Sequence, residues 1–134
     1  MQPIVPFRTP KGIKWRDISI YFTSEEVVQI KAGNASEGRD FIHMGFADRR
    51  KRFKERTPDW SWKTLREFAK HQKEISLYDK DVDLRIKRNL KSYVHVIRKR
   101  LQYLFKINVD PFYPYNRETR SWEARFTVLD TTQE

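Results

Sequence analysis

The chain has 134 residues, a length that fits one domain, and it contains no cysteine. The absence of cysteine excludes disulfides and thiolate metal sites, and it is typical of proteins from a reducing compartment. No apolar run is long enough to cross a membrane, and the first 15 residues hold three prolines and no apolar core, unlike a signal peptide. We therefore expect a cytoplasmic protein with no membrane partner.

Charge and aromatic content indicate a folded domain with a basic surface. Nine phenylalanines, six tyrosines and four tryptophans supply large apolar side chains for a packed core. The net charge is +10, and most of it comes from two segments. Residues 49–56 carry six cations and one acid, and residues 85–106 carry eight cations and no acid. Such a concentration of positive charge is typical of a surface that binds a polyanion.

The N-terminal part of the chain predicts an extended arm followed by a small antiparallel sheet. Three prolines prevent regular structure in residues 1–14. Beyond Trp15, apolar and polar residues alternate, as they do in strands with one buried face. A loop is expected at residues 33–38, which are rich in glycine and small polar residues. The three expected strands are residues 18–22, 28–31 and 41–46.

The middle of the chain predicts a first amphipathic helix. Trp62, Leu65 and Phe68 recur at helical spacing, so we expect a helix over residues 60–72. Asp59 precedes this segment, and its carboxylate can accept hydrogen bonds from the free N–H groups of the first turn.

A short extended segment and three alternating aspartates come next. We expect the extended segment at residues 75–77. Asp79, Asp81 and Asp83 alternate as in some metal loops, but the glycine and the later glutamate of a calcium loop are absent. Negative charge stabilises the N-terminus of a helix. We therefore interpret the aspartates as the start of the next helix and expect no metal.

The clearest helical pattern runs from about Leu84 to Phe105. At 100° per residue, its apolar residues fall on one face and its polar residues on the other. Whether a break near residues 84–88 divides this helix is left open by the pattern. The apolar stripe consists of Ile86, Leu90, Val94, Ile97, Leu101 and Phe105. The opposite face carries Arg88, Ser92, His95 and Lys99, with Lys91 at its flank.

The C-terminal part predicts a hairpin. Asp110 and Pro111 end the helical region. Residues 112–115 and 122–128 are expected to be strands, and residues 116–120 form a polar turn between them. Residues 130–134 are expected to be a polar tail.

The order of sheet, helix, connector, basic helix and hairpin resembles the winged helix-turn-helix, especially the OmpR/PhoB-type effector domain of bacterial response regulators. The likeness rests on residues 93–101 (YVHVIRKRL), which are similar to that family's recognition helix, and on Trp122 to Val128, which resemble its closing wing strand. The resemblance implies an α+β winged helix-turn-helix over residues 15–129, with an N-terminal antiparallel sheet and a C-terminal β-hairpin wing.

The resemblance also implies a function, which is binding of double-stranded DNA in transcription regulation. A recognition helix of this kind lies in the major groove, so the basic helix at about residues 85–106 is expected there. Arg88 and Lys91 would meet phosphates or guanine edges. Ser92, His95 and Lys99 are the candidate contacts to base edges.

Two further regions are candidates for DNA contact. Arg117 and Arg120 lie at the expected hairpin tip, and such a tip commonly approaches the minor groove, where arginine is favoured. The basic loop is expected to clamp phosphates without reading sequence. Its candidate residues are Arg49, Arg50, Lys51 and Arg52.

The aromatic residues leave a second function open. Trp62 and Trp122 are expected in the core, whereas Tyr113 and Tyr115 could stack on single-stranded bases. Binding of RNA or single-stranded nucleic acid is therefore the main alternative to binding of duplex DNA. A small metal-dependent nuclease and a domain that binds an acidic protein are the remaining alternatives.

Catalysis has little support in the sequence. The three histidines lack the spacing of a zinc-binding helix, and neither a nucleophilic cysteine nor a glycine-rich phosphate loop is present. We therefore expect no enzymatic activity, no catalytic residue and no cofactor. The pattern leaves open whether the chain forms a homodimer or joins a larger regulatory assembly.

Overall fold

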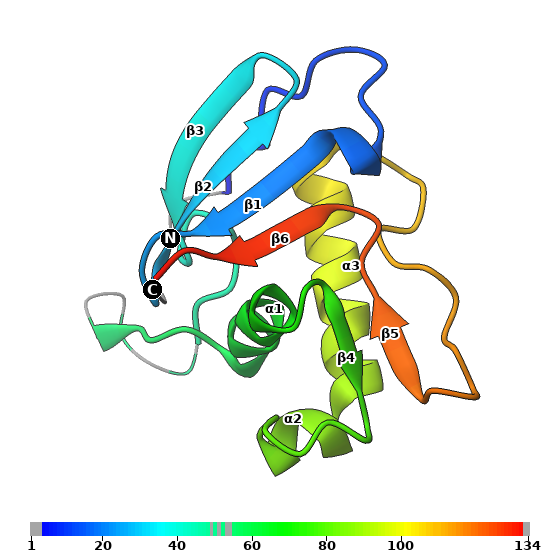
Figure 1. Ribbon diagram of the computed structural model, residues 1–134. Coiled ribbons are helices and arrows are strands. Elements are labelled where there is room, and N and C mark those ends of the chain that lie inside the picture. Colours follow the sequence, from blue (N-terminus) through cyan, green and yellow to red (C-terminus); the bar gives the residue numbers. More distant parts are fainter. Residues whose placement is uncertain (1–3, 49, 51, 53–54, 133–134) are drawn as a thin grey trace.

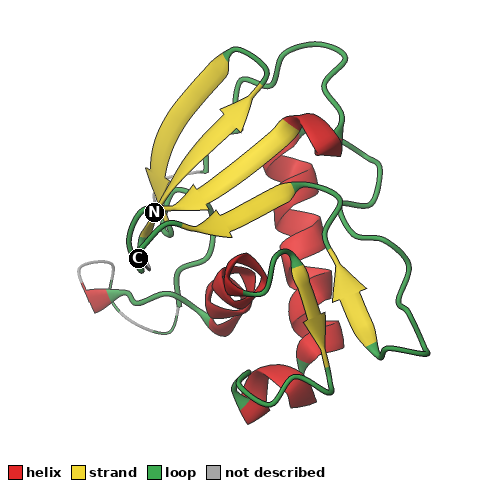
Figure 2. Ribbon diagram, viewed as in Figure 1, coloured by secondary structure: helices red, strands yellow, loops and turns green. Residues whose placement is uncertain are grey.

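A four-stranded sheet with helices packed on one of its faces makes up most of the fold (Figure 1, Figure 2). The computed structural model describes residues 4–48, 50, 52 and 55–132. Its three α-helices and its β-strands form an α+β fold, as the sequence predicted.

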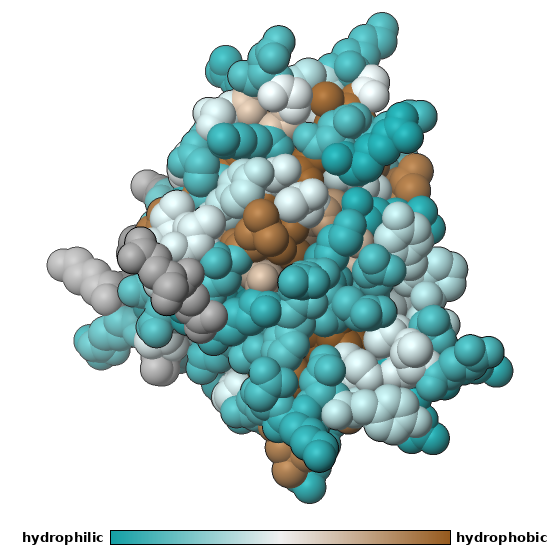
Figure 3. All heavy atoms as spheres, in the orientation of Figure 1, coloured by the Kyte–Doolittle hydropathy of each residue, from teal (hydrophilic) through white to brown (hydrophobic). Residues whose placement is uncertain are grey.

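The main sheet combines the N-terminal strands with the last strand of the chain. Its order is β3-β2-β1-β6, in which β1, β2 and β3 are antiparallel and β6 runs parallel to β1. Alternate residues such as Ile20 and its partners Ile30 and Val128 are fully buried on the helix side. Hydrophilic side chains cover most of the molecule on the side seen in Figure 3. The strands are β1 (Ile18–Phe22), β2 (Val27–Ala32), β3 (Ala35–Asp40) and β6 (Thr127–Asp130).

The first two strands confirm the alternating pattern, but the third strand lies elsewhere than predicted. Residues 35–40 form β3, so most of the expected loop at 33–38 is strand. Gly33 has a positive φ of 59° and stands in a tight turn after which Ala35 pairs with Ala32. The expected strand at 41–46 is instead mainly a turn, in which the N–H of Phe46 donates to the carbonyl of Phe41.

Helix α1 (Trp60–Lys70) confirms the first predicted helix and its cap. The Asp59 carboxylate accepts from the backbone N–H of Trp62 at 2.9 Å. Trp62, Leu65 and Phe68 are buried, as their spacing predicted. The helix ends where Gln72 and Lys73 adopt positive φ angles.

The basic segment from Leu84 to Phe105 forms two helices, so the helix does break near residues 84–88, a question that the sequence pattern left open. A five-residue helix, α2 (Leu84–Arg88), is followed by Asn89 and then by α3 (Leu90–Phe105). The Asp83 carboxylate caps α2 by accepting from the N–H of Arg85 at 2.7 Å, which confirms a helix-start role for this aspartate. The side-chain amide of Asn89 donates to the carbonyl of Arg85 at 2.9 Å, which ends the short helix before α3 begins.

The apolar stripe of α3 is the centre of the hydrophobic core. Val94, Ile97 and Leu101 are fully buried. At the C-terminal end of the helix, the Phe105 ring contacts the ring of Trp15, which lies in the short 3-10 helix η1 (Trp15–Asp17), with the centroids 5.8 Å apart.

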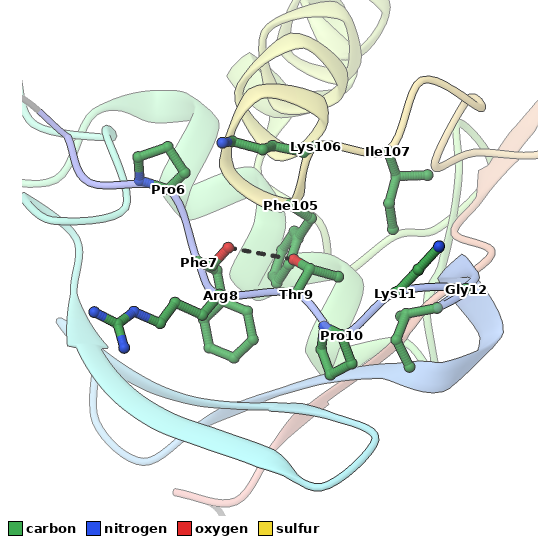
Figure 4. A pocket seen from close by; sticks show the side chains of 11 residues that line it. Pro6, Phe7, Arg8, Thr9, Pro10, Lys11, Gly12, Phe105, Lys106 and Ile107 are labelled. Atoms are coloured by element: carbon green, nitrogen blue, oxygen red, sulfur yellow. Dashed lines mark hydrogen bonds between the residues drawn. The ribbon is translucent and has the colours of Figure 1, made fainter.

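The N-terminal arm has no helix or strand over its described part, yet it is anchored to α3. The Phe7 N–H donates to the Leu104 carbonyl at 2.8 Å, and the Phe7 ring is buried with its centroid 5.4 Å from that of Phe105. Figure 4 shows the arm crossing the end of α3 at this point. The crossing leaves a pocket of about 440 Å³ that Arg8, Lys11 and Lys106 line together with apolar side chains.

The prediction of one continuous strand over residues 122–128 is wrong, because the chain bends at residues 125–126. Its first part, β5 (Ser121–Glu123), pairs antiparallel with β4 (Glu74–Ser76) and forms a hairpin with residues 112–116 through two isolated bridges. Its last part is β6, which joins the main sheet. The chain passes from one sheet to the other at this bend, where the Phe126 side chain is fully buried.

Residues of the expected polar tail help to hold β6 in place. The Thr131 N–H donates to the carbonyl of Phe22 at 3.0 Å, and the Arg66 guanidinium lies 3.3 Å from the Asp130 carboxylate. Burial raises the pKa of Asp130. Hydrogen bonds from Thr132 and the charges of Arg66 and Lys70 lower it, and the net result lies below the ordinary 3.8. Asp130 therefore stays charged inside the β6–α1 contact.

The position of Ile97 at the core centre gives a test of the fold. We expect Ile97→Ala to lower the free energy of unfolding by about 2–5 kcal/mol, because it removes methylene groups and leaves a cavity. Urea unfolding of the variant measures the loss. A loss below about 0.5 kcal/mol, the size typical of a surface substitution, would contradict the buried position of this stripe.

Candidate nucleic-acid interface

Burial of the apolar stripe leaves the opposite face of α3 in contact with solvent. Ser92, His95 and Lys99 are exposed on that face, as helical geometry predicted. Tyr103, which is 58% exposed, and Lys106 continue the face towards the C-terminal end of the helix. One side of α3 therefore offers hydrogen-bonding and cationic groups along its whole length.

The eight cations of residues 85–106 divide into two groups. Four are held by neighbouring residues: Arg98 lies 3.0 Å from Asp110, and Arg100 lies 2.6 Å from Asp59. Lys87 donates to the carbonyl of Asp79 at 2.7 Å, and the Arg85 guanidinium lies 4.4 Å from the centroid of the Trp60 ring. The other four are exposed and have no hydrogen bond or ion pair to another residue that the structure describes: Arg88, Lys91, Lys99 and Lys106.

A groove of about 560 Å³ lies where α2 and α3 meet the hairpin. Arg88 and Lys91, from the helices, and Arg117, from the hairpin tip, all line it. The structure thus brings together three residues that the sequence predicted as DNA contacts. The full lining is Leu77, Lys87, Arg88, Leu90, Lys91, Tyr115, Arg117 and Trp122. No acidic residue belongs to this lining, so the groove is electropositive.

Two aromatic rings form the hairpin side of the groove. The centroids of Tyr115 and Trp122 lie 5.3 Å apart, and both rings are accessible from the groove. Trp122 is only half-buried, so the expectation that it belongs to the core is met in part. An edge-on contact with the buried Phe112 anchors the Trp122 ring to the core. Sequence alone could not decide the position of Tyr115.

The hairpin tip is tied to β4. The Asn116 side chain accepts from the N–H groups of Glu118 and Thr119, at 3.0 and 3.2 Å. The Ser76 hydroxyl donates to the carbonyl of Thr119 at 2.6 Å. Both tip arginines are exposed, and the guanidinium of Arg120 lies 5.8 Å from the centroid of the Tyr78 ring. The tip therefore presents Arg117 and Arg120 from a fixed turn.

The described residues of the predicted phosphate clamp, Arg50 and Arg52, do not line the groove beside α3. A bridge between Ala47 and Pro58 closes the segment that contains these two arginines. The Arg50 guanidinium donates to the Asp48 carboxylate at 3.0 and 2.9 Å, and the hydrogen bond and charge of Asp48 raise the pKa of Arg50. Arg52 is exposed, whereas Arg49 and Lys51 lie outside the described residues.

The alternating aspartates have individual structural contacts. The Asp79 carboxylate accepts from the N–H of Ser76 at 2.8 Å, and Asp81 lies 3.6 Å from His71. Asp83 caps α2. Over the part of the chain that the structure describes, no group of three or more histidines and acidic residues is arranged to hold a metal ion.

Comparison of the chain with protein-family models, with curated proteins and with solved structures gave no match. Within the described residues, no helix combines the length and the apolar character needed to cross a membrane.

Replacement of two neighbouring cations on α3, Lys99 and Arg100, should change the stability of the fold by very different amounts. Arg100→Ala removes the partner of Asp59, the cap of α1, and we expect it to lower the free energy of unfolding by about 1–2 kcal/mol. Lys99→Ala changes an exposed side chain and should cost less than about 0.5 kcal/mol. Urea unfolding of both variants provides the comparison. Equal losses of unfolding free energy in the two variants would contradict the conclusion that Arg100 stabilises the fold through Asp59 and that Lys99 does not.

Proposed function

We propose that this chain is a winged-helix module that binds double-stranded DNA and acts in transcription regulation. The observation that carries the proposal is the surface made by the exposed face of α3 and the adjoining groove. Four candidate cations project from it without partners among the described residues: Arg88, Lys91, Lys99 and Arg117. A cationic surface with unpaired side chains suits the DNA backbone, because binding releases condensed counterions.

The order and pairing of the elements support the winged-helix part of the proposal. In chain order, α1, β4, α2 and α3 precede the hairpin of residues 112–124, and β5 of that hairpin pairs with β4. This pairing places the hairpin tip beside the start of α3, where the two share a groove. A wing next to a recognition helix is the arrangement expected of this class of DNA-binding domain.

The side chains on the exposed face of α3 suit binding in a DNA groove. The major groove of B-DNA admits one α-helix. Lys99 can donate to guanine acceptors, and the short side chain of Ser92 can donate or accept. His95 offers a ring nitrogen in either role. Arg88 and Lys91, at the junction of α2 and α3, would meet phosphates or guanine edges, and phosphate contacts orient a protein on the duplex without reading its sequence.

A second candidate function is binding of single-stranded nucleic acid. Tyr115 and Trp122 favour it, because their rings line a groove that also holds four cations. Base–aromatic stacking beside a positive groove is the usual means of holding single strands. The groove offers one pair of rings, whereas the exposed face of α3 carries polar groups along the whole helix, so we place this function second.

Salt-titrated binding tests both candidates. We expect a labelled duplex to bind more tightly than the matched single strand or duplex RNA. For the duplex, the logarithm of affinity should fall linearly with the logarithm of salt, with a slope of about −4.5 to −7, which corresponds to roughly five to eight phosphates. Fluorescence anisotropy measures all three ligands.

Each alternative has its own signature in this experiment. Tighter binding of the single strand, with loss of that preference in Tyr115→Ala, would favour the second function. A salt-independent signal, or no binding to any of the three nucleic acids, would contradict polyanion binding and leave an acidic protein as the partner. Degradation of the labelled strand on addition of a divalent metal would indicate a nuclease.

A further inference from the structure

A second concave surface lies beyond the C-terminal end of α3, and its lining shares no residue with the proposed DNA surface. Its volume is about 410 Å³, within the range of small-molecule sites. It is lined by the end of the arm, by η1, by the segment after α3, by Tyr113 of the hairpin and by Arg125 just after it. The lining residues are Ile13, Lys14, Trp15, Arg16, Ile107, Val109, Tyr113 and Arg125.

The walls of this groove are apolar and partly open to solvent. Val109 is 62% exposed and Tyr113 is 41% exposed, although both are large apolar side chains. Trp15 is buried beside them, and its indole N–H donates to the carbonyl of Val109 at 2.6 Å. This hydrogen bond holds η1 and the segment after α3 together, so the groove is preformed. A ligand that covered Val109 and Tyr113 would remove apolar surface from water.

All charged residues of the lining are cations: Lys14, Arg16 and Arg125. Arg125 is held in place, because its Nε donates to the carbonyl of Phe112 at 3.2 Å and its guanidinium lies 4.5 Å from the centroid of the Tyr113 ring. Within the described residues, the guanidinium has no carboxylate partner. A fixed arginine fork of this kind matches the geometry of a carboxylate.

We propose that this groove binds a small ligand with an aromatic or aliphatic body and one carboxylate group. The carboxylate pairs with Arg125, and the body lies against Val109 and Tyr113 over the edge of Trp15. Charge complementarity selects this class, because an apolar cation would meet three like charges and a fully polar anion would leave the apolar walls uncovered. The site is independent of the proposed function, since it requires no nucleic acid.

Titration of the complete chain with 1-naphthoate tests the site. The indole N–H signals of the four tryptophans can be followed by nitrogen-15 NMR, and the Trp15→Phe variant identifies the signal of Trp15. We expect that signal to shift on addition of naphthoate. The neutral analogue 1-naphthamide, which has the same body, should bind about tenfold more weakly, a ratio that corresponds to about 1.4 kcal/mol.

Three variants separate the parts of the proposal. Arg125→Gln should lower the affinity for naphthoate to that for the amide and leave the amide unaffected. Val109→Asp changes an exposed residue, so the fold should persist, and both ligands should bind more weakly. Lys63→Gln removes one charge from α1 and is the matched control, for which no change is expected.

Several results would overturn the proposal. If the Trp15 signal does not respond to naphthoate, the groove holds no such ligand. Equal affinities for naphthoate and the amide would show that the carboxylate is not recognised. If Arg125→Gln fails to fold, the Val109→Asp variant provides the test. Unchanged binding of naphthoate by Val109→Asp would show that the ligand binds elsewhere.

Discussion

Burial of one apolar stripe of α3 fixes the direction of every other side chain on that helix. Val94, Ile97 and Leu101 are fully buried, and a helix cannot bury two opposite faces against the same core. Ser92, His95 and Lys99 are consequently held towards solvent. The same burial sets the position of Phe105, which anchors both the arm and η1. The candidate DNA surface and the apolar groove are therefore both consequences of how α3 packs.

Local partners determine which cations are available to a ligand. Arg98 and Arg100 belong to the same basic run as Lys99, yet each pairs with an acid from a distant part of the chain. Their charge contributes to the long-range potential, but each guanidinium is already paired with a carboxylate of this chain. Arg88 and Lys91 meet no such acid among the described residues and instead line the hairpin groove with Arg117. The net charge of a segment thus overstates the number of cations that can bind a phosphate.

Elements defined by local periodicity were predictable, and elements defined by distant pairing were not. The spacing of apolar residues located α1, the stripe of α3 and the first two strands. β3 is an edge strand in which no residue is buried, so no alternation of apolar and polar residues marked it. β6 pairs with β1 from the other end of the chain, and no local signal can specify that partner. The Tyr115–Trp122 pair likewise depends on how the hairpin folds back towards the helices.

The most direct test of the proposed DNA surface compares two triple variants that lose the same charge. One replaces Arg88, Lys91 and Lys99 with glutamine, and the other replaces three exposed lysines of β2 and α1, namely Lys31, Lys63 and Lys70. Affinity for duplex DNA is measured across a salt series after both variants are shown to melt cooperatively. The first variant should lose most of its affinity, and the magnitude of its salt slope should fall by about 2–3. The second should bind nearly as well as the unmodified chain. Equal losses in the two variants would show that binding follows net charge alone, which would contradict a specific surface on α3.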